Sequence, residues 1–214
     1  MNANASTAVA LIGVGQLFDA IEAHWPLVGE GRLLHTLRLT ATDDAGAQTA
    51  ALLASVDPTR TAFFAALDSQ AINHARLDVY ATARLRGFRA ASVRHPSAIV
   101  APDARIGENC WIGAGALLAR GVRIGHNTIV SDGVRLDAGA QLGSHGWVGA
   151  GASVGARTQV GPHALIGADV RLAADLRIGR HCVVDVPGTY AESLADGTFI
   201  DPLFPLPVRI YDGA

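Results

Sequence analysis

Four histidines of this chain have a spacing that suits proton-transfer chemistry or metal binding. His145, His163 and His181 follow one another at eighteen-residue intervals, and His126 precedes the first of them by nineteen residues. An imidazole titrates near neutral pH, so His126 and His145 are candidate general bases. The competing interpretation is structural, because histidine and asparagine are tolerated in left-handed turns. For the three regularly spaced histidines as a set, we favour the structural interpretation.

Glycine and acidic residues near the N-terminus form a second group of candidates. Gly13 and Gly15 follow an apolar run, Val9–Ile12, and apolar residues then recur at helical spacing. A strand, a glycine turn and a helix can hold a phosphate, although the third glycine of the dinucleotide fingerprint is absent and a structural turn explains the pair equally well. Asp43 and Asp68 follow two later apolar runs. We assign all four residues to substrate binding.

A six-residue repeat in the sequence predicts the structural elements that position these groups. An aliphatic residue returns at every sixth position from Val100 to Val184. Hexad repeats are typical of parallel β-helices, in which three strand-and-turn units close one triangular coil of eighteen residues. The series is Val100, Ile106, Ile112, Leu118, Ile124, Val130, Leu136, Leu142, Val148, Val154, Val160, Ile166, Leu172, Ile178 and Val184.

The turn positions support the same fold independently. The residue three after each aliphatic is nearly always one that tolerates positive φ. These residues are Asp103, Asn109, Gly115, Gly121, Asn127, Gly133, Gly139, His145, Gly151, Arg157, His163, Asp169, Asp175 and His181. We therefore predict a mostly β fold of about five coils.

The hexads resemble the left-handed parallel β-helix of bacterial acyltransferases. The segment Arg94–Ile99, which enters the first coil, is similar to the sialic-acid O-acetyltransferases and nucleotide-activated amino-sugar N-acetyltransferases. In that family a small nucleotide-sugar-binding domain precedes the β-helix. The resemblance thus implies a Rossmann-like α/β domain at residues 1–93, a β-helix at 94–188 and a Pro-rich tail at 189–214.

The resemblance also implies an activity. It implies acetyl transfer from acetyl-CoA to an amino or hydroxyl group of a nucleotide-activated sugar, in bacterial surface-glycan synthesis. Family members use a histidine in a Glu-His-Asp segment as the general base. Carried over without gaps, that histidine falls on Ala138, and a second family histidine falls on Trp147. Both positions therefore depart from the family pattern.

Two histidines could replace the missing base. Gly125–Asp132 resembles the family segment locally, with His126 as the base, but it lies two hexads too early and should occupy a different corner. His145 lies one hexad beyond the expected position, at the edge of an apolar face. We favour His145.

One outward column of the predicted coil is apolar, and the other two are polar. The apolar column consists of Trp111, Ile129, Trp147, Leu165 and Val183. An exposed apolar stripe marks an interface, and in this fold we expect a homotrimer. Small residues beside the stripe allow another surface to approach closely. For the acetyl-CoA that the resemblance implies, we assign contacts to Trp147, Gly149 and Gly167.

The first 93 residues are predicted to contain further strands and helices. Strands are expected over Leu34–Thr40 and Thr61–Leu67, and helices over Ala47–Ser55 and Ala71–Leu85. Asp68, Asn73 and Arg76 match positions of the family's third strand and helix. Arg76, Arg84 and Arg86 are expected on the solvent side of the last helix.

Composition excludes several classes of function. The net charge is −2 and the chain has no lysine, which excludes a Walker lysine, a Schiff-base lysine and a polybasic tail. We expect no nucleic-acid partner. No apolar run reaches the ~18 residues of a membrane helix, and no signal peptide is evident, so we expect no membrane partner and a cytoplasmic protein. Cys110 and Cys182 lie four coils apart, too far for a disulfide.

Two alternatives remain for the function. The first is a catalytically lapsed relative that serves as a binding or structural subunit, because Ala138 cannot accept a proton. The second is a zinc site of the γ-carbonic-anhydrase kind, which shares this type of helix. We expect no metal, since histidines stacked along one corner form a ladder and not a tetrahedral cup.

Overall fold

The structure is a computed structural model that describes residues 8–30, 32, 34–69 and 73–209. The chain divides into two compact units, Met1–Val93 and Arg94–Ala214, which are described separately. Within the described ranges, no helix combines the length and the apolar character that a membrane crossing requires.

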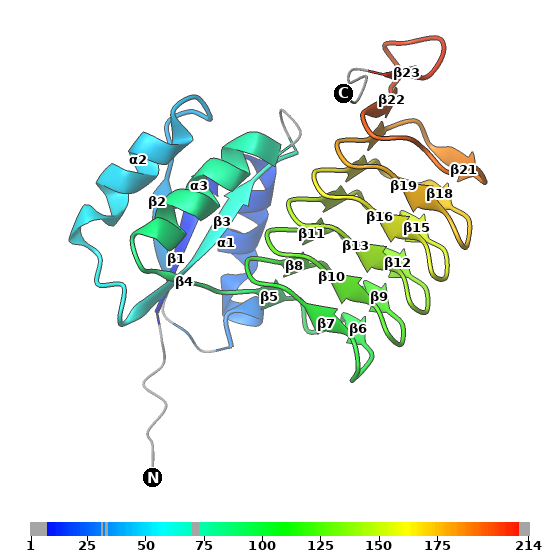
Figure 1. Cartoon of the computed structure of the whole chain (residues 1–214). Helices are drawn as coiled ribbons and strands as arrows, with labels where there is room; N and C mark the ends of the chain where they lie inside the picture. The colour runs from blue at the N-terminus through cyan, green and yellow to red at the C-terminus, as the bar shows by residue number, and fades with distance from the viewer. Residues whose placement is uncertain (1–7, 31, 33, 70–72, 210–214) are drawn as a thin grey trace. The chain divides into compact units, whose positions relative to one another are not determined.

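The first unit is a parallel α/β sheet (Figure 1). Its strand order is β2-β1-β3-β4, and all strand pairs run parallel. The predicted strand over Thr61–Leu67 is confirmed, whereas the predicted helix start at Ala71 lies outside the described residues. The elements are β1 (Ala8–Val14), α1 (Gln16–Val28), β2 (Leu34–Arg38), α2 (Ala45–Leu52), the 3₁₀ turn η1 (Leu53–Ser55), β3 (Thr61–Leu67), α3 (His74–Leu85) and β4 (Arg89–Ala90).

Both faces of this sheet are covered, which explains why its central strands are continuously apolar. Alternate residues of a strand point to opposite faces. Ala10, Ile12 and Phe63 share a core with residues of α2 and α3. Val9 and Leu11 are equally buried and point to the other face, where α1 packs against β1 and β3. The central strands therefore hold their carboxyl ends, and the loops that follow them, in fixed positions.

The predicted solvent position of Arg76 is wrong. Its side chain is fully buried, and Nη1 donates a hydrogen bond to the carbonyl oxygen of Leu67, at the end of β3, over 3.4 Å. A guanidinium with several donors can be buried where carbonyl oxygens accept from it. Arg84 and Arg86 are exposed, as predicted.

The second unit is a parallel β-helix whose coils stack in three sheets, seen as rows of short arrows in Figure 1. The first face contains β6 (Ile99–Val100), β9 (Leu117–Leu118), β12 (Arg135–Leu136), β15 (Ser153–Val154), β18 (Val170–Leu172) and β21 (Gly188–Tyr190). The second face contains β7 (Arg105–Ile106), β10 (Arg123–Ile124), β13 (Gln141–Leu142), β16 (Gln159–Val160) and β19 (Arg177–Ile178).

The third face ends in a short hairpin. It contains β8 (Trp111–Ile112), β11 (Ile129–Val130), β14 (Trp147–Val148), β17 (Leu165–Ile166), β20 (Val183–Val184), β22 (Thr198–Ile200) and β23 (Val208–Arg209). The strand β5 (Val93–Arg94) lies at the division between the units. Partners differ by eighteen residues, as in Ile129 with Trp147, so each hexad position stacks on its equivalent one coil away.

The hexad aliphatics and the residues two positions before them fill the interior of the coil. This core is a single cluster that runs from Cys110 to Val184. Both cysteines are free and buried in it, as predicted from their separation. The turn residues have positive φ as predicted, except Asp103. Asp103 lies between β6 and β7, in the first turn of the first coil.

Residues after 188 continue the β-helix before the chain leaves it. β21 adds to the first face and β22 pairs in parallel with β20, while Leu194 and Ile200 pack against the core. The antiparallel pairing of β23 with β22 then covers the open edge of the third face, which otherwise invites pairing with other chains. The predicted tail therefore includes a structured cap.

The apolar column is less exposed than predicted. Trp111, Ile129 and Val183 are buried, with 7%, 0% and 6% of their surface exposed. Trp147 and Leu165 are only partly buried. An interface with another subunit can therefore use only part of this column.

Candidate functional site

The carboxyl ends of β1 and β3 bring three predicted substrate-binding residues together. Strand order reverses between these strands, since β2 lies on one side of β1 and β3 on the other. In open α/β sheets, ligands bind at such a switch point. Gly13 lies near the end of β1, Gly15 follows that strand, and Asp68 follows β3. Asp43 lies in the loop after β2 and is exposed.

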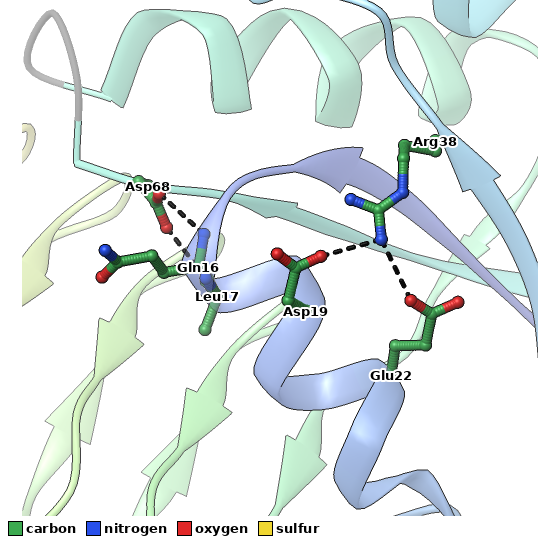
Figure 2. Close-up of polar contacts among 6 residues, drawn as sticks. All are labelled: Gln16, Leu17, Asp19, Glu22, Arg38 and Asp68. Carbon is green, nitrogen blue, oxygen red and sulfur yellow. Dashed lines mark hydrogen bonds and ion pairs between the residues drawn. The ribbon is translucent and has the colours of Figure 1, made fainter.

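Asp68 caps the first turn of α1 (Figure 2). Its Oδ2 accepts a hydrogen bond from the backbone N–H of Gln16, and its Oδ1 accepts one from the N–H of Leu17, each over 2.9 Å. The N-terminus of a helix attracts anions through these N–H groups and its dipole. A carboxylate of the chain itself therefore occupies the position where a phosphate would bind.

The two glycines are explained by close packing at the same place. A Cβ added to Gly13 would lie 1.8 Å from the carbonyl oxygen of Ala66, and one added to Gly15 would lie 2.3 Å from Asp68 Oδ2. Side chains cannot replace these hydrogens without moving the backbone or breaking the cap. The glycine pair is thus required by the contact between β1, β3 and α1, whether or not a ligand binds.

Asp68→Ala is expected to destabilise the first unit by about 0.5–2 kcal/mol, because α1 loses the acceptor of two N–H groups. Urea unfolding followed by circular dichroism measures the change. Asp43→Ala, which removes an exposed carboxylate from a nearby loop, is the control and should change stability by less than about 0.5 kcal/mol. Equal effects of the two substitutions would contradict a capping role.

A second polar cluster beside α1 was not predicted. Arg38, at the end of β2, forms ion pairs with Asp19 at 2.7 Å and Glu22 at 3.0 Å (Figure 2), and its guanidinium lies 4.3 Å from the centre of the Phe18 ring. The hydrogen bond with Asp19 raises the pKa of Arg38. All three charged side chains are well exposed, so this cluster ties β2 to α1 without contributing much stability.

One corner of the β-helix carries His126, His145, His163 and His181. We call the turns that join the second face to the third face the histidine corner. Two neighbouring positions of each turn at this corner form two columns, in which each residue stacks on its equivalent one coil away. They contain Glu108, His126, Ser144, Pro162 and Arg180 in one column and Asn109, Asn127, His145, His163 and His181 in the other.

His126 lies on a different corner from Ala138, as predicted, and it shares its corner with His145. The backbone N–H of His145 donates to the carbonyl oxygen of His126 over 2.8 Å. Nineteen residues are one coil plus one position, which places the two in adjacent coils and adjacent columns. Ala138, the position expected from the family, lies on the corner between the first and second faces.

The hydrogen bond to His126 determines which ring nitrogen carries the proton. The backbone N–H of Glu108 donates to His126 Nδ1 over 3.0 Å. A backbone amide can only donate, so Nδ1 must present its lone pair, and the neutral ring carries its proton on Nε2. His126 is exposed and can donate a hydrogen bond from Nε2, but in this tautomer Nε2 cannot accept a proton.

His145 is bonded to a side chain instead. Asn127 Nδ2 lies 3.0 Å from His145 Nδ1, and the His145 and His163 rings stack with centroids 4.8 Å apart. An amide offers a donor and an acceptor, so turning it over would let Nδ1 donate and leave the lone pair on Nε2. The geometry therefore favours His145 over His126 as a proton acceptor.

The stacked histidines are poorly arranged to share a metal. Zinc binds imidazole nitrogen at about 2.0–2.1 Å, so two nitrogens on one ion are at most about 4.2 Å apart and their lone pairs converge. The rings of His145, His163 and His181 instead lie nearly parallel, with interplanar angles of 26° and 20° and centroids 4.8 and 4.9 Å apart.

We therefore predict no zinc site in this stack. Protein purified without added metal should contain well under one zinc per chain by plasma mass spectrometry, and His163→Ala should leave the content unchanged. Stoichiometric zinc that is lost in the His163 variant would overturn this prediction.

A hollow of about 220 Å³ lies on the second face beside the histidine corner. Gly143 and Gly161 contribute to it and also begin two turns of that corner. Its walls carry two amides and one guanidinium. The lining residues are Gln141, Leu142, Gly143, Gln159, Val160, Gly161, Arg177 and Ile178.

The residues predicted to contact acetyl-CoA lie on and beside the third face. Gly149 and Gly167 are buried, and the stacking of coils accounts for both: an added Cβ would lie 2.5 Å from the Ala168 nitrogen and 2.2 Å from Asp185 Oδ1, respectively. Trp147 is partly buried. Of the three, Trp147 is the residue whose exposure suits a ligand contact.

Comparisons with known proteins define the class of fold. The family profile described as the GMPPB C-terminal domain matches residues 88–187, just under half of the chain. A search of curated proteins found no match. Solved structures confirm the left-handed β-helix of hexapeptide-repeat acetyltransferases that the sequence predicts.

Three of these structures are similar over nearly the whole chain. Perosamine N-acetyltransferase from Caulobacter crescentus, a histidine-to-asparagine variant in complex with CoA and GDP-perosamine, is 23% identical, with a TM-score of 0.51 and coverage of 92% of this chain and 94% of that one. The acetyltransferase domain of PglB from Neisseria gonorrhoeae is 17% identical (TM-score 0.53, coverage 94% and 100%). WeeI from Acinetobacter baumannii is 12% identical (TM-score 0.58, coverage 94% and 99%).

Proposed function

We propose that this protein is an acetyltransferase that moves an acetyl group from acetyl-CoA to an amino or hydroxyl group of a nucleotide-activated sugar, in the cytoplasm and for bacterial surface-glycan synthesis. One observation carries the proposal: a single corner of the β-helix places His126 and His145 in adjacent coils beside a hollow. The same fold serves other reactions, so the site and not the fold supports the chemistry.

His145 is the proposed general base. With its proton on Nδ1, its Nε2 lone pair takes a proton from the amino or hydroxyl group while the nitrogen or oxygen of that group bonds to the thioester carbon. The carbon–sulfur bond then breaks, CoA leaves as the thiolate, and the proton held by His145 can return to it. No covalent enzyme intermediate is needed, so one base and one hydrogen-bond donor suffice.

His126 is proposed as that donor. The backbone bond from Glu108 keeps its proton on Nε2, and the ring is exposed at the same corner. An N–H group in this position can stabilise the negative charge that develops on the thioester oxygen. The roles of the two histidines therefore differ because their Nδ1 partners differ.

The hollow on the second face is the proposed place for the acyl-carrying arm of acetyl-CoA. Gln141 and Gln159 offer amides that suit the amide groups of such an arm, and Arg177 supplies a positive charge. Trp147, on the third face, is a further proposed contact, together with the backbone at Gly149 and Gly167.

We interpret the first unit as a Rossmann-like domain that binds the nucleotide at its switch point. Because Asp68 holds the amides of α1, we expect recognition through the loops after β1 and β2, at Gly13, Gly15 and Asp43, and not through a phosphate on the helix. Perosamine N-acetyltransferase, in the structure compared above, is bound to CoA and GDP-perosamine, which suggests the class of substrate.

We also propose a homotrimer formed through the partly buried part of the apolar column. Trp147→Glu should weaken it, because the substitution places a charge in a desolvated contact. Sedimentation velocity compares the variant with the wild type, and Gln141→Glu, on the second face, is the control. A wild type that sediments as a monomer would exclude the trimer.

Ligand binding tests the proposed function before turnover is attempted. A ligand at a hundred times its Kd stabilises the folded state by about 2.7 kcal/mol, which raises the melting temperature by several degrees. We expect acetyl-CoA and at least one of a panel of UDP-, GDP- and dTDP-sugars to do so. Absence of a response to CoA and to every sugar would contradict the proposal.

A catalytically lapsed binding subunit is the second candidate. The observation in its favour is that both histidines accept a hydrogen bond at Nδ1, while Ala138 occupies the position of the family's base. Such a protein would respond to a sugar nucleotide in the thermal assay and transfer no acetyl group.

A further inference from the structure

Two asparagines of the histidine corner form a buried chain of amides that ends on His145. Asn109 Nδ2 donates to Asn127 Oδ1 over 2.7 Å, and Asn127 Nδ2 donates to His145 Nδ1 over 3.0 Å. Both asparagines are fully buried. We propose that Asn127, oriented by Asn109, decides which nitrogen of His145 carries the proton and so acts as a positioning residue for the general base. This inference rests on the proposed function.

The chain of amides has two directions, and they give His145 opposite properties. In the observed direction, Nδ1 accepts, so the neutral ring carries its proton on Nε2 and acts as a donor. If both amides turn over, Asn127 Oδ1 accepts from Nδ1–H, and the lone pair lies on Nε2. Only the second arrangement can take a proton from a substrate through Nε2. We take the arrangement in the structure as the resting state.

The turn itself does not explain the amides. Asn109 and Asn127 adopt φ of 54° and 55°, a left-handed conformation that glycine provides at Gly115, Gly121 and Gly133 in other corners. Glycine would satisfy the same backbone without burying polar atoms. A buried amide destabilises the fold unless it is hydrogen-bonded, and the chain from Asn109 to His145 supplies such bonds.

His126 provides an internal reference in the same corner. Its Nδ1 accepts from the backbone N–H of Glu108, a donor that cannot be turned over. The proton on His126 must therefore remain on Nε2 whatever happens to the asparagines. A measurement that reads both rings separates an effect of Asn127 from a general change in the corner.

The test is ¹⁵N NMR of the imidazole nitrogens in the full-length protein, at a pH where the rings are neutral. We expect the proton of wild-type His145 on Nε2. In Asn127→Asp, an ionised carboxylate can only accept, so the proton should move to Nδ1. In Asn127→Gly, which keeps the left-handed turn, no amide fixes the tautomer, so a minor Nδ1-protonated form should appear beside the Nε2-protonated form, as in free histidine. His126 should stay protonated on Nε2 in all three proteins.

Activity provides a second readout once a substrate is known. Asn127→Asp should keep kcat within about threefold of the wild type, because the base tautomer is held permanently, while Asn127→Gly should lower kcat by about tenfold or more and leave KM for acetyl-CoA unchanged.

The inference is overturned if wild-type His145 already carries its proton on Nδ1, or if the tautomer is the same in all the variants that fold. Asn127→Gly alone suffices if the aspartate variant does not fold. A change of tautomer in a protein that transfers no acetyl group would count against the proposed function and leave the role of Asn127 intact.

Discussion

His145→Ala is expected to lower kcat by roughly 10²–10⁴-fold and to leave acetyl-CoA binding largely unchanged, because a general base acts in the transition state. The substitution removes an imidazole whose Nδ1 partner, the Asn127 amide, can be reversed. Steady-state kinetics with acetyl-CoA and the best sugar nucleotide measure kcat, and the thermal shift with acetyl-CoA measures binding.

Two matched variants serve as controls for this prediction. His163→Ala removes the ring stacked on His145 from the same column, and His126→Ala removes the proposed donor; both should lower kcat less than His145→Ala does. If His145→Ala and His126→Ala each retain full activity, neither histidine takes part in the reaction.

Leu136→Ala is expected to destabilise the β-helix by about 2–5 kcal/mol, because it leaves a cavity in a close-packed core. The Leu136 side chain is fully buried in the middle of the first face, and its strand pairs with Leu118 on one side and Val154 on the other. Denaturant unfolding followed by circular dichroism measures the loss of stability.

The neighbouring residue provides the control for this substitution. Arg135 points outward from the same strand and forms an ion pair with Asp137 at 3.4 Å, with 60% of its side chain exposed. Arg135→Ala should change stability by less than about 1 kcal/mol. Similar losses in the two variants would contradict the assignment of alternate residues to the inside and outside of the coil.

The β-helix could be predicted from the sequence because each coil repeats the same physical requirements. An aliphatic residue fills the interior at every sixth position, and a residue that tolerates positive φ occupies each turn, so the errors of single positions average out. Asp103, in the first turn of the coil, is the exception. The apolar column was predicted correctly in type, but the repeat does not reveal that Trp111, Ile129 and Val183 are buried.

The site was harder to predict because its contacts are distant in sequence. Asp68 caps α1 from more than fifty residues away, and the burial of Arg76 depends on where β3 ends relative to α3. Neither the cap by Asp68 nor the burial of Arg76 can be recognised from the residues next to them in the sequence. The adjacency of His126 and His145 was within reach of the sequence, because the eighteen-residue period puts them side by side. Each histidine was compared with Ala138 and not with the other.

The central claim is acetyl transfer, and mass spectrometry of the sugar nucleotide tests it most directly. The wild-type protein is incubated with acetyl-CoA and a panel of UDP-, GDP- and dTDP-linked amino and neutral sugars, with His145→Ala as the control. We predict that at least one sugar nucleotide gains one acetyl group as CoA is released, and that the variant does so far more slowly. A panel in which no sugar is acetylated, although CoA and a sugar nucleotide both bind, would contradict the account and establish the lapsed relative in its place.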